Sequence, residues 1–172
     1  MLAATGSSSA GVTAMTRRVL VGSDHAAIAM RIAVAEALVL RGFEVEQIGP
    51  VEGQKSDYPD AAVAVGEQVR DGRAARGVLC CGTGIGMSIA ANKVHGVRAA
   101  LVHDPVTARL AAEHNAANVL CLGGRLLANV YAIDLVNTWL DTSFVARHQV
   151  RIDKITAYEQ CAAEAPVPDA HA

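Results

Sequence analysis

The sequence is poor in aromatic residues and carries no surplus of positive charge. Aromatic residues make up only 3% of its 172 residues, although 52% are hydrophobic, so Ala, Val, Leu and Ile must build the core. The formal net charge is −2. Binding to nucleic-acid phosphates needs a basic surplus, and binding to anionic membranes needs a Lys/Arg cluster. The composition therefore argues against a nucleic-acid or a membrane partner.

Paired cysteines and long apolar runs are also absent. None of the four cysteines has the C-x-x-C spacing of zinc ligands, and the adjacent pair Cys80–Cys81 is poorly placed for a disulfide. No apolar run reaches the roughly 18 residues of a membrane-spanning helix. The N-terminus lacks the charged and apolar regions of a signal peptide. These absences predict a soluble, cytoplasmic protein with reduced thiols.

The length suits one domain, which we expect between two disordered tails. Residues 1–16 are rich in Gly, Ser, Ala and Thr and carry no charge, and Met15 is a second candidate start residue within them. Residues 161–172 hold two prolines and show no periodicity. We therefore predict a leader at 1–16, a single domain at 17–160 and a tail at 161–172.

Short apolar runs alternate with helical patterns throughout the predicted domain. The expected strands are 18–22, 43–48, 77–81, 97–101 and 118–122. The expected helices are 26–41, 60–71, 85–93, 105–114, 129–141 and 150–160. This alternation predicts an α/β protein, a three-layer α/β/α Rossmann-like fold with a five-stranded parallel sheet and a C-terminal helix.

Ligands of such folds bind outside the carboxyl ends of the strands. Polar and glycine residues gather there, in 23–25, 81–86 and 123–125. We expect His114 and Asn115, in the loop before the fifth strand, to join them.

The segment Cys80–Lys93, CCGTGIGMSIAANK, has the strongest chemical signature. Glycines at alternate positions 82, 84 and 86 let the backbone approach an anionic ligand closely. Met87 breaks the dinucleotide-binding pattern G-x-G-x-x-G, and a Walker loop would need Gly-Lys-Ser/Thr at 87–89. Next to this loop, a Cys81 thiolate would act as a base toward a carbon acid, and the amides would stabilise an enediolate.

Each candidate also has a simpler structural interpretation. Cys80 is better explained as a small hydrophobic residue in a strand, whereas for Cys81 filler and base are equally favoured. Asp24 and His25 suit a helix start as well as a site, and His114 and Asn115 suit a helix end. The last basic group is a solvated face or a phosphate clamp, and comprises Arg147, His148 and Arg151.

Together these segments resemble the ribose-5-phosphate isomerase B family. The matching segments are GSDHA (22–26), SDYPD (56–60), CGTGIGMSIAANK (81–93), EHNAANVLCLGGR (113–125) and RHQVRIDKI (147–155). They occur in the family's order, and the resemblance runs from Arg18 to Gln160. It implies an aldose–ketose isomerase of the pentose phosphate pathway that needs no metal or organic cofactor. It also implies a homodimer whose subunits share their active sites, and leaves open a pairing of dimers.

The resemblance also assigns roles to individual residues. Cys81 would move the proton between C2 and C1, and His114 would open the sugar ring. Thr83 and the amides of the loop would hold the enediolate; the loop residues are Gly82, Gly84, Ile85 and Gly86. Asp24 and Asn115 would bind sugar hydroxyls, with Tyr58 near the reacting end. The phosphate would lie among His25, Arg125, Arg147 and Arg151.

One departure from the family pattern leaves the sugar open. The family usually has two glycines before the Arg-His pair, where this sequence has Val145 and Ala146. A changed position of Arg147 would alter the accepted chain length, so tetrose 4-phosphates, allose 6-phosphate and galactose 6-phosphate are alternatives to ribose 5-phosphate. The galactose-type relatives generally lack the loop cysteine, which favours the pentose. A sugar-phosphate binding module without catalysis is the alternative from another class.

Overall fold

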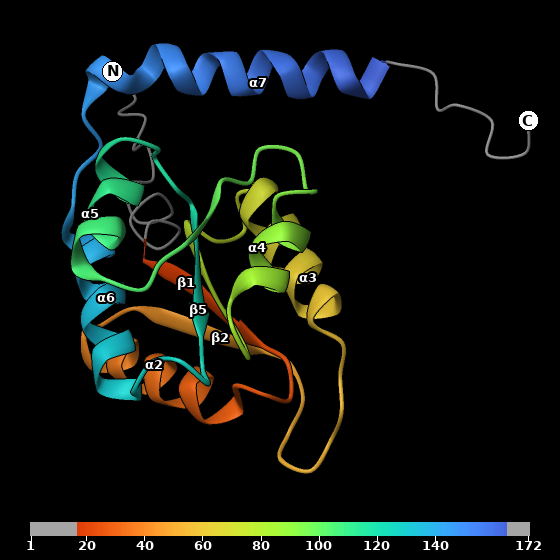
Figure 1. The fold of residues 1–172 in the computed structure, drawn as a ribbon, viewed down its shortest axis with the longest axis vertical. Helices are drawn as coiled ribbons and strands as arrows, with labels where there is room; N and C mark the ends of the chain where they lie inside the picture. The colour runs from red at the N-terminus through yellow and green to blue at the C-terminus, as the bar shows by residue number, and fades with distance from the viewer. Residues whose placement is uncertain (1–16, 165–172) are drawn as a thin grey trace, which may run out of the picture.

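A five-stranded parallel sheet lies between two layers of helices in the computed structural model, which describes residues 17–164 (Figure 1). The strands are β1 (Arg18–Ser23), β2 (Glu44–Ile48), β3 (Arg76–Cys81), β4 (Ala99–Leu101) and β5 (Val119–Gly123). The helices are α2 (Ile28–Leu40), α3 (Tyr58–Arg70), α4 (Ile85–Ala91), α5 (Pro105–Glu113), α6 (Asn129–Asp141) and α7 (Gln149–Glu164), with a 3₁₀ turn at Ala146–His148. The predicted fold class is confirmed.

The strands follow the order β2-β1-β3-β5-β4, and every neighbouring pair is parallel. β2 pairs with one edge of β1, and the next strand along the chain, β3, pairs with the other edge. The order of the strands therefore reverses between β1 and β3, and a crevice opens at their carboxyl ends at such a point. Register places Ser23 beside Cys80 and Cys81 beside Gly123.

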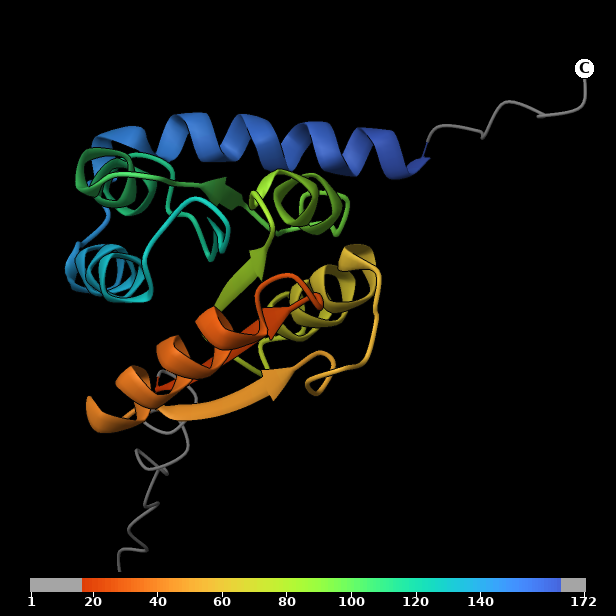
Figure 2. The same cartoon turned by 60° about the horizontal axis from the view of Figure 1, so that its bottom comes forward.

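Each face of the sheet packs against its own helices. Helices α2, α5 and α6 cover one face with Leu, Val and Ala side chains and the buried Trp139. Helices α3 and α4 cover the other face (Figures 1 and 2). Strand alternation sends Cys80 into the first cluster and Cys81 into the second. The two adjacent cysteines thus lie on opposite faces, as the sequence predicted.

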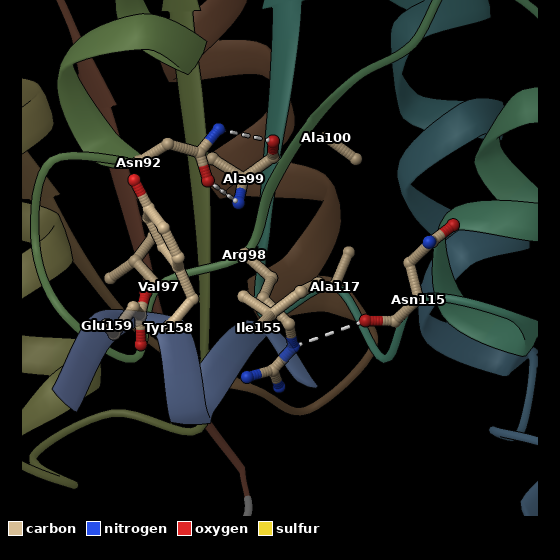
Figure 3. A pocket seen from close by; sticks show the side chains of 10 residues that line it. All are labelled: Asn92, Val97, Arg98, Ala99, Ala100, Asn115, Ala117, Ile155, Tyr158 and Glu159. Carbon is tan, nitrogen blue, oxygen red and sulfur yellow. Dashed lines mark hydrogen bonds between the residues drawn. The ribbon is translucent and has the colours of Figure 1, made fainter. Parts of the chain in front are cut away.

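β4 is shorter than expected because residues 97 and 98 are tied elsewhere. The amide of Val97 donates to the carbonyl of Val94, and that of Arg98 donates to Asn118 Oδ1 at 2.7 Å. Pairing begins only at Ala99. On its other side, the Asn92 side chain accepts from the Ala99 amide at 2.8 Å and donates to the Ala99 carbonyl at 2.9 Å (Figure 3).

α7 lies across one end of the molecule and runs past the sheet in both views (Figures 1 and 2). It ends at Glu164 rather than at residue 160, so residues 161–164, which we expected in the tail, are helical. The predicted leader at 1–16 and residues 165–172 lie outside the described part of the chain. Within 17–164, no helix has both the length and the apolar character needed to cross a bilayer.

Candidate active site

A hollow of about 260 Å³ opens at the carboxyl ends of β1, β3 and β5. It is lined by Asp24, His25, Ala26, Tyr58, Cys81, Gly82, Thr83, Gly86 and Arg125. These residues come from the segments after β1 and β5, from the start of α3, and from the end of β3 with its following loop. The hollow therefore occupies the point where the strand order reverses, which is where the sequence predicted a site.

Cys81 lines this hollow, although the residue is only 4% exposed. The amide of Gly84 donates a hydrogen bond to its sulfur atom, with 3.1 Å between N and Sγ. The turn that aims this amide requires glycine, since Gly84 has φ +78° and a Cβ would lie 2.5 Å from Leu101 Cδ1.

The other two buried cysteines, Cys80 and Cys121, lie in the core. Burial, with a contribution from the neighbouring Cys81, raises the pKa of the Cys80 thiol to about 12. Burial also raises the pKa of Cys121 well above its ordinary value. Both thiols are inert strand residues at neutral pH. The interpretation of Cys80 as a core residue is therefore supported, and Cys81 is the buried cysteine that borders a hollow.

The loop after Cys81 uses some of its donors internally. The Gly84 amide binds the sulfur, and the Ile85 amide donates to Thr83 Oγ1 at 3.3 Å. We had expected the whole run from Gly82 to Gly86 to face a ligand. Because α4 is only seven residues long, its dipole contributes little to binding an anion. An anion would be bound by the donors of the loop itself.

Asp24 and His25 are held by the turn between β1 and α2. Asp24 Oδ1 accepts from the Ala26 amide at 2.9 Å, and α2 begins without a side-chain cap. Asp24 therefore shapes the turn without capping the helix. His25 Nδ1 lies 2.8 Å from the Ser56 carbonyl, which can only accept, so Nδ1 carries the hydrogen. In the neutral ring Nε2 is left as the acceptor.

Tyr58 and Arg125 close two sides of the hollow. The Tyr58 ring lies so near the loop that a Cβ on Gly86 would approach its ring carbons to 2.8 Å. The Arg125 guanidinium packs over Gly82, with Nη1 3.3 Å from the position of an added Cβ. The Arg125 amide also donates to the Gly82 carbonyl at 3.0 Å. Thiol, backbone donors, carboxylate, imidazole and guanidinium thus meet in one hollow.

The remaining predicted residues form a second cluster at the end of α5. The His114 ring stacks on His148, with centroids 4.1 Å apart. Arg147 Nε donates to His148 Nε2 at 3.1 Å, and Arg151 lies against His148 Nδ1. A neutral imidazole has one acceptor nitrogen, so the ring accepts from only one arginine at a time. The amide of Val145 donates to the Glu113 carbonyl at 2.9 Å, which holds this segment against α5.

The two clusters lie at opposite ends of the strands. The predicted position of His114 and Asn115 at the carboxyl ends was therefore wrong. A loop that precedes a parallel strand lies at that strand's amino end. Cys81 pairs with Gly123 at the far end of β5, four residues beyond Val119. At ~3.3 Å per residue, β5 alone separates the clusters by roughly 13 Å. His114, Asn115, Arg147 and Arg151 therefore cannot reach Cys81 of their own chain.

His148 makes the stability of the fold depend on pH. Burial lowers the pKa of this ring, and neighbouring His114, Arg151 and Arg147 lower it further, against the opposing Glu113. The unfolded chain then binds a proton that the folded ring refuses, so stability falls as the pH drops through about 6.5.

We therefore expect wild-type protein to lose more Tm between about pH 7.5 and pH 5.5 than His148→Gln does. Thermal unfolding at both pH values measures the difference. Equal losses in the two proteins would contradict the assignment of this pH dependence to His148.

A separate groove of about 430 Å³ runs between β4 and α7 and borders Asn115 (Figure 3). Its apolar wall includes Val97, Ala99, Ala100, Ala117 and Ile155, with Tyr158 on α7. Arg98 crosses its floor and donates from Nε to the Asn115 carbonyl at 3.2 Å. This groove adjoins the second cluster, not the Cys81 hollow.

Some of what the site uses had no signal in the sequence. The Ser56 carbonyl, which orients His25, is a backbone atom that any residue could supply. Nor did a pattern indicate that His148 stacks on His114. Among residues 17–164, no group of three or more His, Cys, Asp and Glu side chains is placed to hold a metal ion.

Comparison with known proteins places this geometry in a family context. The family model described as Ribose/Galactose Isomerase matches residues 19–155. The chain is 39% identical over 145 residues to ribose-5-phosphate isomerase B of Escherichia coli, covering 84% of this chain and 97% of that protein. It is 37% identical over 143 residues to D-erythrulose-4-phosphate isomerase of Pectobacterium atrosepticum, covering 82% and 94%.

A solved structure agrees with these matches. The ribose-5-phosphate isomerase B of Mycoplasma genitalium, with bound ribulose-5-phosphate, superposes with a TM-score of 0.79 and 41% identity. The match covers 83% of this chain and 96% of that one.

Proposed function

The chain belongs to the ribose/galactose isomerase family, and from that membership we propose that it interconverts ribose 5-phosphate and ribulose 5-phosphate. As a member it is an isomerase that moves a carbonyl between adjacent carbons of a sugar phosphate. The observation that carries the proposal is the Cys81 thiol, which receives a backbone hydrogen bond and lines the same hollow as Arg125.

In the proposed reaction Cys81 takes the proton from C2 of the open-chain aldose. The electrons of that C–H bond form the enediolate, and the proton returns at C1 while the O2 hydroxyl proton ends on O1. No electrons leave the substrate, so the step needs no oxidant or reductant. Thr83 and the free donors of its loop would hold the enediolate oxygens. Arg125 and His25 would bind the phosphate, whose binding energy fixes the reacting carbons.

We further propose that a second copy of the chain completes each hollow. Within one chain the hollow holds Cys81, whereas the residue proposed to open the ring, His114, lies with the two arginines of its cluster at the other end of β5. In a twofold dimer, His114, Asn115, Arg147 and Arg151 of one copy would meet Cys81 of the other, and two equivalent sites would form. His114 would then protonate the ring oxygen, with Asn115 on a sugar hydroxyl.

Exposed apolar surface beside each half-site supports this pairing. Ile85 and Ile89 on α4, next to the Cys81 loop, are 51% and 57% exposed. The groove of Figure 3, beside Asn115, offers apolar side chains of β4 and α7. Bringing Asn115 of one copy to Cys81 of the other also brings its groove to α4 of that other copy. The pairing would bury both surfaces in one step.

Sugar length is the least constrained part of the proposal, because a similar protein is named for a four-carbon substrate. Tetrose 4-phosphates, allose 6-phosphate and galactose 6-phosphate remain the alternatives. Val145 ties the segment before Arg147 to the Glu113 carbonyl, so the clamp position is set by backbone contacts of this chain. The distance from clamp to thiol across the dimer then selects the substrate.

A panel of four-, five- and six-carbon sugar phosphates tests the assignment. We expect kcat/KM for ribose 5-phosphate to exceed that for the others by at least about tenfold, which corresponds to 1.4 kcal/mol of transition-state binding. Loss of the C2 deuterium label to solvent, followed by NMR, detects the proton transfer itself. A preference for another sugar would replace the substrate but keep the chemistry. Binding without isotope exchange for any sugar would leave only a binding module.

A further inference from the structure

Arg31 is a buried cation that none of the proposed roles uses. It lies in the first turn of α2 and is only 6% exposed. Its Nη2 donates to the Pro50 carbonyl at 2.8 Å, whereas Nε and Nη1 are buried without a hydrogen-bond partner. Leaving two guanidinium nitrogens, Nε and Nη1, unpaired in the interior destabilises the fold. A side chain kept there at such a cost suggests a role other than stability.

The guanidinium packs tightly against the segment that follows β2. Gly49, at φ +135°, has no room for a side chain, since a Cβ would lie 2.5 Å from Arg31 Nη1 and 2.3 Å from the Ser23 carbonyl oxygen. Ser23 ends β1 and immediately precedes Asp24. Arg31 therefore joins the start of α2 to the segment after β2, at the point where Gly49 packs against the end of β1.

The segment after β2 leads directly to two residues of the hollow. Residues 49–57 connect β2 to α3, and their Ser56 carbonyl holds His25 Nδ1. Tyr58 follows at once and packs on the Gly86 backbone. Arg31 thus fixes one end of this loop at Pro50, while His25 and Tyr58 depend on the other end.

We infer that Arg31 is a positioning residue, which clamps the start of the 49–57 loop to α2 and so sets His25 and Tyr58 relative to Cys81. It touches none of the residues proposed to contact the reacting atoms, and lies on the α2 side of the sheet, beside Cys80, whereas Cys81 faces the α3 side. The inference rests on the proposed isomerase activity for its kinetic consequence, but the clamp itself is a property of the fold.

The experiment compares Arg31→Met, Arg31→Lys and the control Arg41→Met, which removes an exposed arginine from the far end of the same helix. We expect Arg31→Met to lower kcat about 10- to 100-fold, because misplacing side chains by ~1 Å has effects of this size. KM should rise by a smaller factor than kcat falls, because His25 moves with the loop whereas Arg125, the other proposed phosphate ligand of the hollow, stays in place. Arg31→Lys keeps one donor for the Pro50 carbonyl and should recover most of the activity.

Stability and loop exchange separate positioning from a merely structural role. Arg31→Met removes two unpaired buried nitrogens, so its Tm should be equal to or above that of wild type. Amide hydrogen exchange in residues 49–57 should accelerate in Arg31→Met and stay unchanged in Arg41→Met. A kcat within twofold of wild type, or a loss of activity that accompanies a fall in Tm with unchanged loop exchange, would overturn the inference.

Gly49→Ala provides an independent route to the same state. Its Cβ would push the loop away from Ser23 and Arg31 while leaving the guanidinium in place. We expect the same fall in kcat, and no further fall when Arg31→Met is added. If the losses in kcat of the two substitutions were additive, the inference that both act by releasing the 49–57 loop would be wrong. If wild type isomerised no sugar phosphate, the proposed function would fail, and the loop-exchange comparison would still decide whether Arg31 holds the loop.

Discussion

Replacing Cys81 by alanine is expected to lower kcat for ribose 5-phosphate by about 10²- to 10⁴-fold, the usual contribution of a general base. Without the thiol, the hollow keeps Asp24 and His25, which we propose bind a sugar hydroxyl and the phosphate and not the C2 proton. Cys81→Ser preserves the shape of the site, but a serine hydroxyl is a far weaker acid than a thiol and remains neutral. We expect it to be nearly as inactive as the alanine variant. Steady-state kinetics at neutral pH measure both effects.

Cys80→Ala is the matched control for this experiment. It removes a thiol from the adjacent residue, on the other face of the sheet, where burial already keeps that thiol protonated. We expect a modest loss of Tm and little change in kcat. Undiminished turnover by Cys81→Ser would remove Cys81 from the role of base. A Tm of Cys81→Ser close to that of wild type would show that any loss of turnover comes from chemistry and not from unfolding.

Mixing two inactive variants, Cys81→Ala and His114→Asn, is expected to restore about a quarter of wild-type activity, if twofold dimers share their sites. Random exchange makes half of the dimers hybrid. In each hybrid, one of the two shared sites carries both substitutions and is inactive. The other site has the native Cys81 and the native His114 and is active. The measurement is kcat per chain after unfolding and refolding the two variants together.

Controls for this mixture follow from the proposed interface. Each variant refolded alone should stay inactive. Adding Ile89→Asp to both variants should abolish the recovery, since it places a charge on the exposed apolar face of α4. If the two variants instead remain inactive together while hybrid dimers are shown to form by native mass spectrometry, His114 and Cys81 do not act in one shared site.

The fold could be predicted from the sequence because its three central strands, β1, β3 and β5, are buried on both faces. Runs such as Val78–Cys81 and Val119–Leu122 are continuously apolar, which is typical of central parallel strands, and polar or glycine residues bound them. β4 was predicted too long because its start depends on Asn92 and Asn118, whose side chains bind backbone that a continued strand would use. Such contacts between distant side chains and backbone leave no periodic pattern.

The site was predictable where chemistry and strand ends coincide. Cys81 and its glycine loop follow a buried strand directly, and the structure places them with Asp24, His25 and Tyr58 in one hollow. The predicted position of His114 was wrong because a loop that precedes a parallel strand lies at the amino end of that strand, and the prediction considered only the chemistry of the side chain. Arg31 showed no sign in the sequence, since one arginine in an apolar helix looks like any solvated side chain until its burial is known.

The two hydrogen bonds from Asn92 to Ala99 have a consequence for assembly. β4 is the outer strand on its side of the sheet, and an open outer strand is a template for adding further chains without limit. Asn92 already occupies the amide and carbonyl that Ala99 turns away from β5. A chain that added a strand at this border would have to displace both Asn92 hydrogen bonds, so contacts through side chains are favoured there over strand addition.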